Sequence, residues 1–421
     1  MHIVMGFVGI ITLILIAVIF SSNRKAINLR NVGGAFALQA AIPAFVIFTS
    51  SGADILQGIS TGVQAVIDSA DAGISFLFGP LASDKMFEVF EGNGFVFAFK
   101  VLPIIIFFAS LMGALYYMGI MQWVIKIFGG ALQKMLGTSR TESMYAAANV
   151  FVGQTEAPLV VKPYIRQMTR SELFAVMCGG LSSVAGAVLA GYASLGVSLN
   201  YLIAASFMAA PGGLLMAKLL EPETEKPHDG IKDITKEDEF KENNPVNVID
   251  AAALGAADGL QLSLNVGGML IAFIALIALL NTILGAVGGL FGFEALTIQQ
   301  MLGYLFSPIA FVIVIPWEEA VQAGSFLGQK LVVNEFVAYI DFVAVRETMS
   351  QHSQAIITVA LCGFANLSSM AILLGGLGVM SPTRRPHIAQ MGLKAVMAGT
   401  LSNFMSATLV GLFFSLKTLG A

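Results

Sequence analysis

Two short polar segments hold the side chains of this chain that are best suited to chemistry. Each places one glutamate in an otherwise apolar region: Gly153-Gln154-Thr155-Glu156-Ala157-Pro158 and Asn334-Glu335-Phe336-Val337-Ala338. In the first segment, Gln154, Thr155 and Glu156 are consecutive and offer both hydrogen-bond donors and acceptors. Such a set would suit a polar heterocycle.

The second glutamate has polar residues of a different kind further along the chain. Glu335, Asn366 and Ser369 would form a cluster suited to neighbouring hydroxyl groups, as on a sugar. Phe364 lies just before Asn366 and offers a ring face or edge. The alternative is that the two glutamates are buried structural carboxylates satisfied by helix N-termini.

Oxygen atoms for a cation are also present beside the first segment. Asn149 and Ser183, with freed backbone carbonyls near Val152 and Val184, could form an all-oxygen cage of the kind that hard cations prefer. Asn149 could instead make an ordinary hydrogen bond between helices. The residues alone leave both interpretations open.

The composition shows what kind of scaffold must position these side chains. Of 421 residues, 57% are hydrophobic and only 11% are charged, and the mean hydropathy is +0.82. Ordinary soluble domains carry about 25% charged residues. The composition therefore excludes a soluble enzyme, a disordered chain and a nucleic-acid binder, and it predicts a polytopic all-α membrane protein.

Apolar runs predict about eight transmembrane helices. The expected spans are Ile3–Phe20, Val32–Phe48, Phe95–Met118, Glu172–Tyr192, Tyr201–Leu219, Val248–Val287, Ser353–Leu374 and His387–Phe414. Arg24 and Lys25 follow the first span, so the positive-inside rule places both termini outside the cytoplasm. Residues 50–94 are expected at the outer interface, and an amphipathic stretch around Trp123 at the inner one. Val248–Val287 is too long for one crossing, which predicts an interfacial start.

Two further apolar segments are too interrupted to be simple spans. Thr141–Ile165 and Phe306–Ile340 contain glycine, proline and carboxylates, and irregular backbone at membrane depth must face protein or a water-filled cavity. We interpret both as re-entrant helical hairpins. An ionised carboxylate at the bilayer centre costs at least ~2.5 kcal/mol, so Glu156 and Glu335 must avoid lipid.

The two hairpins form the core of an internal repeat. Each is followed by a span with Cys-Gly and then Ser-Ser: Cys178-Gly179 with Ser182-Ser183, and Cys362-Gly363 with Ser368-Ser369. By the predicted orientation the hairpins enter from opposite sides, which makes the repeat inverted. Paired broken segments of this kind indicate a transporter's midplane binding site.

These features divide the chain into six parts, one of them an acidic linker with nine acidic residues and four lysines between Glu221 and Glu242. The expected parts are scaffold helices with the inner interfacial helix (1–140), the first repeat (141–220), the cytoplasmic linker (221–246), a long scaffold helix with the outer interfacial helix (247–305), the second repeat (306–380) and a C-terminal helix (381–421).

No catalytic motif accompanies the two glutamates. We find no nucleophile with a base, no phosphate-binding loop after a strand and no cysteine set for a metal or haem. A transporter driven by an ion gradient is the preferred interpretation. An intramembrane hydrolase using Glu156 and Glu335, or a channel, remains an alternative.

At this point the motifs resemble one known family, the bacterial concentrative nucleoside transporters. The resemblance covers nearly the whole chain and is carried by the two glutamate segments, with Tyr339 extending the second, and by Cys362-Gly363-Phe364-Ala365-Asn366-Leu367-Ser368-Ser369 and Ser21-Ser22-Asn23-Arg24-Lys25-Ala26-Ile27-Asn28-Leu29-Arg30.

The resemblance implies a sodium-coupled nucleoside symporter and not an enzyme. It would import nucleosides such as uridine across the bacterial inner membrane, as a homotrimer in lipid whose transport parts move like elevators. Proton coupling is the alternative. The residues that would bind substrate or sodium are: for the nucleobase, Gln154, Thr155 and Glu156, with Val188 and Phe364 packing near it; for the ribose, Glu335, Asn366 and Ser369; and for sodium, Asn149, Val152, Ser183 and Val184.

Overall fold

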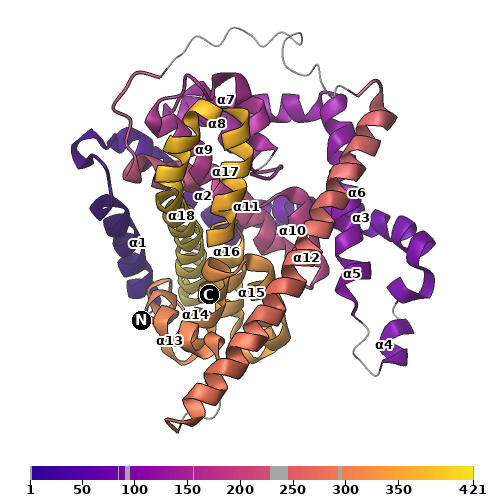
Figure 1. Ribbon diagram of the computed structural model, residues 1–421. Helices are drawn as coiled ribbons and strands as arrows, with labels where there is room; N and C mark the ends of the chain where they lie inside the picture. The colour runs from indigo at the N-terminus through magenta and orange to yellow at the C-terminus, as the bar shows by residue number, and fades with distance from the viewer. Residues whose placement is uncertain are drawn as a thin grey trace.

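The computed structural model (Figure 1) describes residues 2–83, 85–90, 95–154, 156–227, 245–292 and 296–420. Thr155 and residues 228–244 of the predicted linker lie outside this set. Throughout the described residues the regular structure is helical, with no strand, as the sequence predicts.

The helices before the first hairpin are short or lie at the periphery. They are α1 (His2–Ile19), α2 (Leu29–Phe48), α3 (Ser50–Phe78), α4 (Lys85–Val89), α5 (Phe97–Lys100), α6 (Leu102–Tyr117) and α7 (Ile120–Leu136). The first repeat follows as α8 (Arg140–Ala148), the 3₁₀-helix η3 (Ala157–Tyr164), α9 (Arg170–Ser182) and α10 (Gly186–Ser194), and then α11 (Leu199–Leu220).

The second half repeats this order after one long helix. It contains α12 (Val248–Gly289), α13 (Ile298–Val312), α14 (Trp317–Val332), α15 (Glu335–Val345), α16 (Gln351–Leu361), α17 (Leu367–Met380) and α18 (Arg385–Gly420). The remaining 3₁₀ turns are η1 (Arg24–Ala26), η2 (Gly79–Ala82), η4 (Arg346–Thr348) and η5 (Pro382–Arg384).

Eight helices within the described ranges are long and apolar enough to cross a membrane, but their identity differs from the prediction in two places. The segment Ser50–Ala82, predicted at the outer interface, meets the criterion with 33 residues and a mean hydropathy of 1.3. The predicted span Ser353–Leu374 is not among the eight, because it is interrupted between α16 and α17, as expected for the broken helix of the second repeat. Asp54, Asp68 and Asp71 dilute the apolar signal of α3, which explains the first difference.

The longest predicted span forms one helix, with no break at the start that is expected to be interfacial. Helix α12 is continuous from Val248 to Gly289, and three of its glycines (Gly255, Gly259 and Gly267) lie where α6 approaches closely. A Cβ on Gly255 would lie 2.4 Å from the Ala109 carbonyl oxygen of α6. These small residues let α12 pack along α6 (Figure 1).

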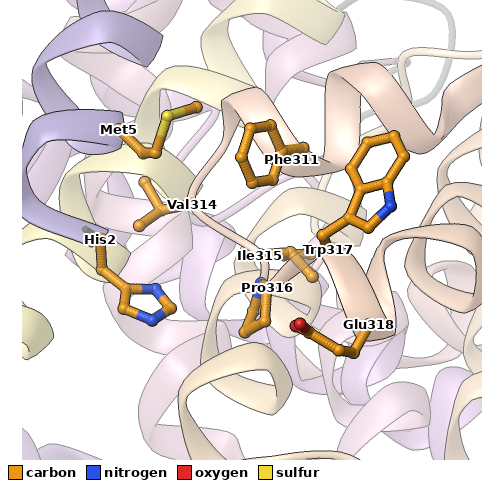
Figure 2. A pocket seen from close by; sticks show the side chains of 8 residues that line it. All are labelled: His2, Met5, Phe311, Val314, Ile315, Pro316, Trp317 and Glu318. Atoms are coloured by element: carbon orange, nitrogen blue, oxygen red, sulfur yellow. The ribbon is translucent and has the colours of Figure 1, made fainter.

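The second hairpin begins beside the N-terminus of the chain. Helices α13 and α14 meet at a bend of 116°, at residues 313–316. Figure 2 shows this turn packed against α1, with a cavity of about 200 Å³ lined by His2, Met5, Phe311, Val314, Ile315, Pro316, Trp317 and Glu318. Glu318 and Glu319 occupy the first turn of α14, where negative charge is favourable to the helix dipole.

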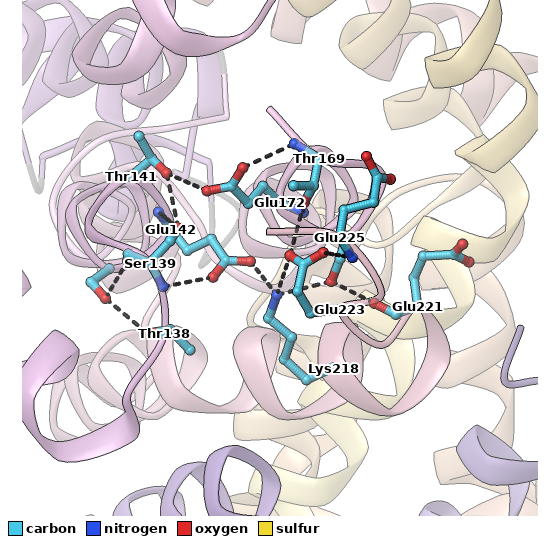
Figure 3. Close-up of polar contacts among 12 residues, drawn as sticks. Thr138, Ser139, Thr141, Glu142, Thr169, Glu172, Lys218, Glu221, Glu223 and Glu225 are labelled. Carbon is cyan, nitrogen blue, oxygen red and sulfur yellow. Dashed lines mark hydrogen bonds and ion pairs between the residues drawn. The ribbon is translucent and has the colours of Figure 1, made fainter. Parts of the chain in front are cut away.

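The first hairpin begins at the opposite end of the protein, in a cluster of charged and hydroxyl side chains (Figure 3). Glu142 in the first turn of α8 pairs with buried Lys218 near the end of α11. Glu221 accepts hydrogen bonds from Arg170 Nε at 2.6 Å and from Lys394 Nζ at 2.8 Å. The two hairpins therefore enter from opposite ends, as predicted for an inverted repeat.

The two Cys-Gly pairs, however, do not occupy equivalent places. Cys178 lies inside α9, whereas Cys362 is the residue directly after α16. Ser183 directly follows α9, so by its position after the helix end it corresponds to Cys362. The sequence motif thus locates both broken helices but gives the wrong register between them.

Candidate functional site

Glu335 lies at the centre of the second hairpin's polar cluster. It is the first residue of α15, it is 3% exposed, and its two carboxylate oxygens accept from different elements. Tyr192 Oη donates to Oε1 at 2.9 Å, and Asn366 Nδ2 donates to Oε2 at 2.9 Å. Tyr192 comes from α10 of the first repeat, so the carboxylate joins the two repeats.

The N-cap of α17 sets the direction of the Asn366 side chain. Asn366 Oδ1 accepts from the Ser369 backbone N–H at 2.8 Å, which leaves the Nδ2 group directed at Glu335. The helix break at residues 362–366 therefore positions this amide next to Glu335. Asn366 and Ser369 are both buried, as the sequence prediction requires of an internal site.

Aromatic rings enclose the Tyr192 side chain from the second hairpin. Its ring centroid lies 4.7 Å from that of Phe336 and 4.6 Å from that of Tyr339. Tyr339 is itself fixed, since its Oη donates to the Thr358 carbonyl at 2.7 Å. Val188 lies one helical turn before Tyr192 on α10 and is buried.

The tip of the first hairpin lies between α8 and η3. Glu156 is exposed, and its Oε2 accepts from the Gly153 N–H at 2.9 Å. Gln154 is buried, and no described group hydrogen-bonds its Oε1. A buried acceptor without a partner costs about 1–3 kcal/mol, which makes Gln154 a place for a ligand donor.

The four residues proposed for a cation lie together around the break between α9 and α10. Asn149, Val152, Ser183 and Val184 are all at most 3% exposed. Ser183 Oγ donates to Asn149 Oδ1 at 3.4 Å and to the Gly179 carbonyl at 2.9 Å. The side-chain and backbone oxygens of these residues provide a donor set suited to a hard cation.

The two halves of the site touch at their helix breaks. The Phe364 N–H of the second break donates to the Ser183 carbonyl of the first at 3.1 Å. Phe364 itself is half-buried. Asn403 of α18 spans both breaks, because its Nδ2 donates to the Ser182 carbonyl at 2.7 Å and the Cys362 carbonyl at 3.0 Å.

Sequence reasoning missed three residues of this region: Tyr192, Lys330 and Asn403. Each is polar and lies in an apolar segment, which is itself a signal for a role inside a membrane protein. Their partners come from other parts of the chain, so the sequence could not show what each one contacts.

Three family models match the chain, each over a different part. The match covers residues 8–81 for "Na+ dependent nucleoside transporter N-terminus", 98–199 for "Nucleoside recognition" and 201–411 for "Na+ dependent nucleoside transporter C-terminus".

Similar proteins match over almost the full length of the chain. An uncharacterized transporter of Haemophilus influenzae is 54% identical, over 99% of both chains, and the nucleoside permease NupC of Helicobacter pylori is 52% identical, over 97% of both. The structure resembles that of CNTnw in an inward-facing substrate-bound state, with a TM-score of 0.94 and 57% identity over 99% of both chains.

Proposed function

The chain belongs to the family of Na+ dependent nucleoside transporters, and we propose that it imports nucleosides such as uridine together with sodium. It is a membrane transporter and not an enzyme, and sodium is its co-transported ion.

The observation that carries the substrate assignment is the hydrogen bonding of Glu335. An ionised carboxylate has about four acceptor positions, and Tyr192 and Asn366 use two of them. The remaining capacity suits two adjacent hydroxyl groups, which a ribose has and a free nucleobase lacks. We therefore assign Glu335, Asn366 and Ser369 to the sugar.

We assign the nucleobase to the first hairpin tip. The support is the unpartnered Gln154 Oε1 and the exposed Glu156 carboxylate, which can accept from ring or exocyclic N–H groups. Thr155, between them in sequence, is assigned by the family resemblance. Val188 and Phe364 would provide the apolar walls beside the base.

We assign sodium to Asn149, Val152, Ser183 and Val184. The ion would draw the end of α8 and the α9–α10 break together. Gln154 comes only two residues after Val152, so the position of its side chain would depend on the bound ion. Sodium would thus organise the base-binding tip. By thermodynamic linkage, a nucleoside must then raise the affinity for sodium by the same factor.

We propose that transport proceeds by an elevator movement. Helices α6 and α12 pack on each other and would remain fixed, while both repeats with α11 and α18 would move. Helices α1 and α2, which sequence analysis grouped with the scaffold, pack against α18 and α11 and would move with them.

We further propose a homotrimer with both termini in the periplasm. The long helix α12 is only 6% buried in its most apolar window, so it offers surface for subunits or lipid. Arg24, Arg170 and Arg384 lie with the charged cluster at the end opposite the N-terminus, and the positive-inside rule places that end in the cytoplasm.

Uptake of radiolabelled uridine into proteoliposomes tests the proposal. We expect accumulation with an inward sodium gradient and little with potassium. Asn149→Ala should raise the sodium concentration for half-maximal uptake at least about tenfold, the loss of one charge-assisted contact, without changing competition by other nucleosides. Uptake that follows a proton gradient and ignores sodium would establish proton coupling and reject the cation site.

A further inference from the structure

Both interrupted helices end inside the protein with the same electrostatic problem. The last four carbonyls of an α-helix have no partner within it, and the helix dipole makes that end partly negative. Helix α9 ends at Ser182 and α16 at Leu361, each among buried residues. Each end therefore needs a donor or a positive charge nearby.

In the second repeat, a lysine supplies that charge. Lys330, in the last turn of α14, is 1% exposed and is among the largest fully buried side chains. Its Nζ donates to the Ala360 carbonyl at the end of α16 at 2.7 Å, and to Asn403 Oδ1 at 2.8 Å. Both hydrogen-bond acceptors are neutral oxygens, and the carboxylate of Glu335 provides an opposite charge that acts on this ammonium group from further away.

In the first repeat, Asn149 holds the corresponding place. It directly follows α8, the first helix of its hairpin, just as Lys330 lies in the last turn of α14. Asn149 Oδ1 is contacted by Ser183, which directly follows α9, just as Lys330 contacts the end of α16. Asn149 and Lys330 thus make corresponding contacts in the two repeats but differ in charge, since the asparagine is a neutral amide and the lysine is an ammonium.

The side chain of Asn403 links the two helix ends directly. Its Nδ2 donates to Ser182 of the first break and Cys362 of the second. Its Oδ1 is an acceptor, and Lys330 Nζ is the donor to it. The ammonium of Lys330 therefore fixes the amide that joins the two breaks.

We propose that Lys330 is a built-in cation that takes, in the second repeat, the place that sodium takes in the first. The proposal rests on the proposed sodium site. It implies that the chain binds one sodium ion and not two, although its repeats are related. It also implies that the sugar-binding half is organised without an ion, whereas the base-binding half depends on sodium. The lysine moves with the transport part in both directions, so it adds no net charge per cycle.

Sodium-dependent thermal stabilisation of the purified full-length protein tests this by counting ions. Each bound ion stabilises by RT ln(1 + [Na+]/Kd), so the slope against the logarithm of sodium concentration reports the number bound. Potassium at equal ionic strength is the reference. We expect a one-ion slope for the wild type.

Three substitutions of the lysine separate an electrostatic role from a packing role. Lys330→Asn and Lys330→Gln place an oxygen ligand where the ammonium was, and we expect at least one of them to give a two-ion slope and a sigmoidal sodium dependence of uridine uptake. Lys330→Met has similar length but no oxygen, and it should keep the one-ion slope while binding uridine more weakly.

The outcomes are distinguishable. A two-ion slope in the wild type would overturn the proposal, and this holds even if every variant fails to fold. One-ion slopes in folded Lys330→Asn and Lys330→Gln would also overturn it and leave sodium coupling intact. The absence of any sodium effect in the wild type would reject the proposed function itself.

Discussion

At the scale of single residues, the site depends on side chains whose acceptors and donors are fixed in advance. Glu335 is oriented by Tyr192 and Asn366, and Asn366 is oriented by capping α17. Such preorganisation reduces the conformational entropy lost when a ligand binds. The carboxylate is therefore the group whose replacement should affect binding most.

Glu335→Gln should abolish measurable uridine uptake. The amide NH2 would face either Tyr192 Oη, whose hydroxyl hydrogen would have to turn away, or Asn366 Nδ2, which can only donate. The variant would also lose two charge-assisted bonds to the sugar. At about 1.5–3 kcal/mol for each bond, the expected loss exceeds about 100-fold in kcat/KM. Proteoliposome uptake measures it.

Tyr192→Phe is the matched control for that substitution. It removes one of the two donors to Glu335 but leaves the carboxylate and the packing on Phe336 and Tyr339 in place. It should cost only about tenfold. Uridine uptake at the wild-type rate by Glu335→Gln would contradict the assignment of this residue to the ribose.

At the scale of elements, the breaks in α9–α10 and α16–α17 are specified by close contacts as much as by unfavourable helix residues. A Cβ on Gly363 would lie 2.3 Å from Asn403 Oδ1 and 2.6 Å from its Nδ2. Only glycine lets α18 approach the second break closely enough for Asn403 to reach both. The break and the crossing helix therefore depend on each other.

Gly363→Ala should destabilise the protein by about 1–3 kcal/mol, since the added methyl group must displace Asn403 and with it two hydrogen bonds. We expect the apparent melting temperature in detergent to fall by several degrees. Gly376→Ala in α17 is the control, because its Cβ would meet no atom within 4 Å. Equal effects of the two substitutions would argue against this account of the break.

At the scale of the whole molecule, function requires one group of helices to move against another. Gly191 on α10 lies at the boundary, where its Cβ would be 3.2 Å from Val101 Cγ1 at the start of α6. Within the proposed scaffold, a Cβ on Gly267 of α12 would lie 3.1 Å from Leu102 Cδ1. These two places can be cross-linked independently.

A disulfide between Val101→Cys and Gly191→Cys should stop uptake, because it ties a moving helix to a fixed one, and a reducing agent should restore it. The pair Leu102→Cys with Gly267→Cys should cross-link without stopping transport, since both residues lie in the scaffold. The native Cys178 and Cys362 are both buried. Full uptake by the oxidised first pair would exclude the proposed movement.

The sequence by itself determined the class and the repeat, and it predicted most residues of the proposed site. Low charge and long apolar runs indicate membrane helices because burying charge in lipid is costly, and the two glutamates in broken segments stand out for the same reason. The inverted hairpins followed from charge and from breaks. These features are local in the chain, so they can be read without coordinates.

The tertiary structure decided which residues meet across the two repeats. Tyr192 reaching Glu335, Lys330 reaching the end of α16, and Asn403 joining Ser182 to Cys362 are contacts between segments 30 to 221 residues apart. The same is true of the register of the Cys-Gly motifs, which only the positions of the helix ends reveal. A polar residue in an apolar segment shows that a partner is needed, but packing alone selects the partner.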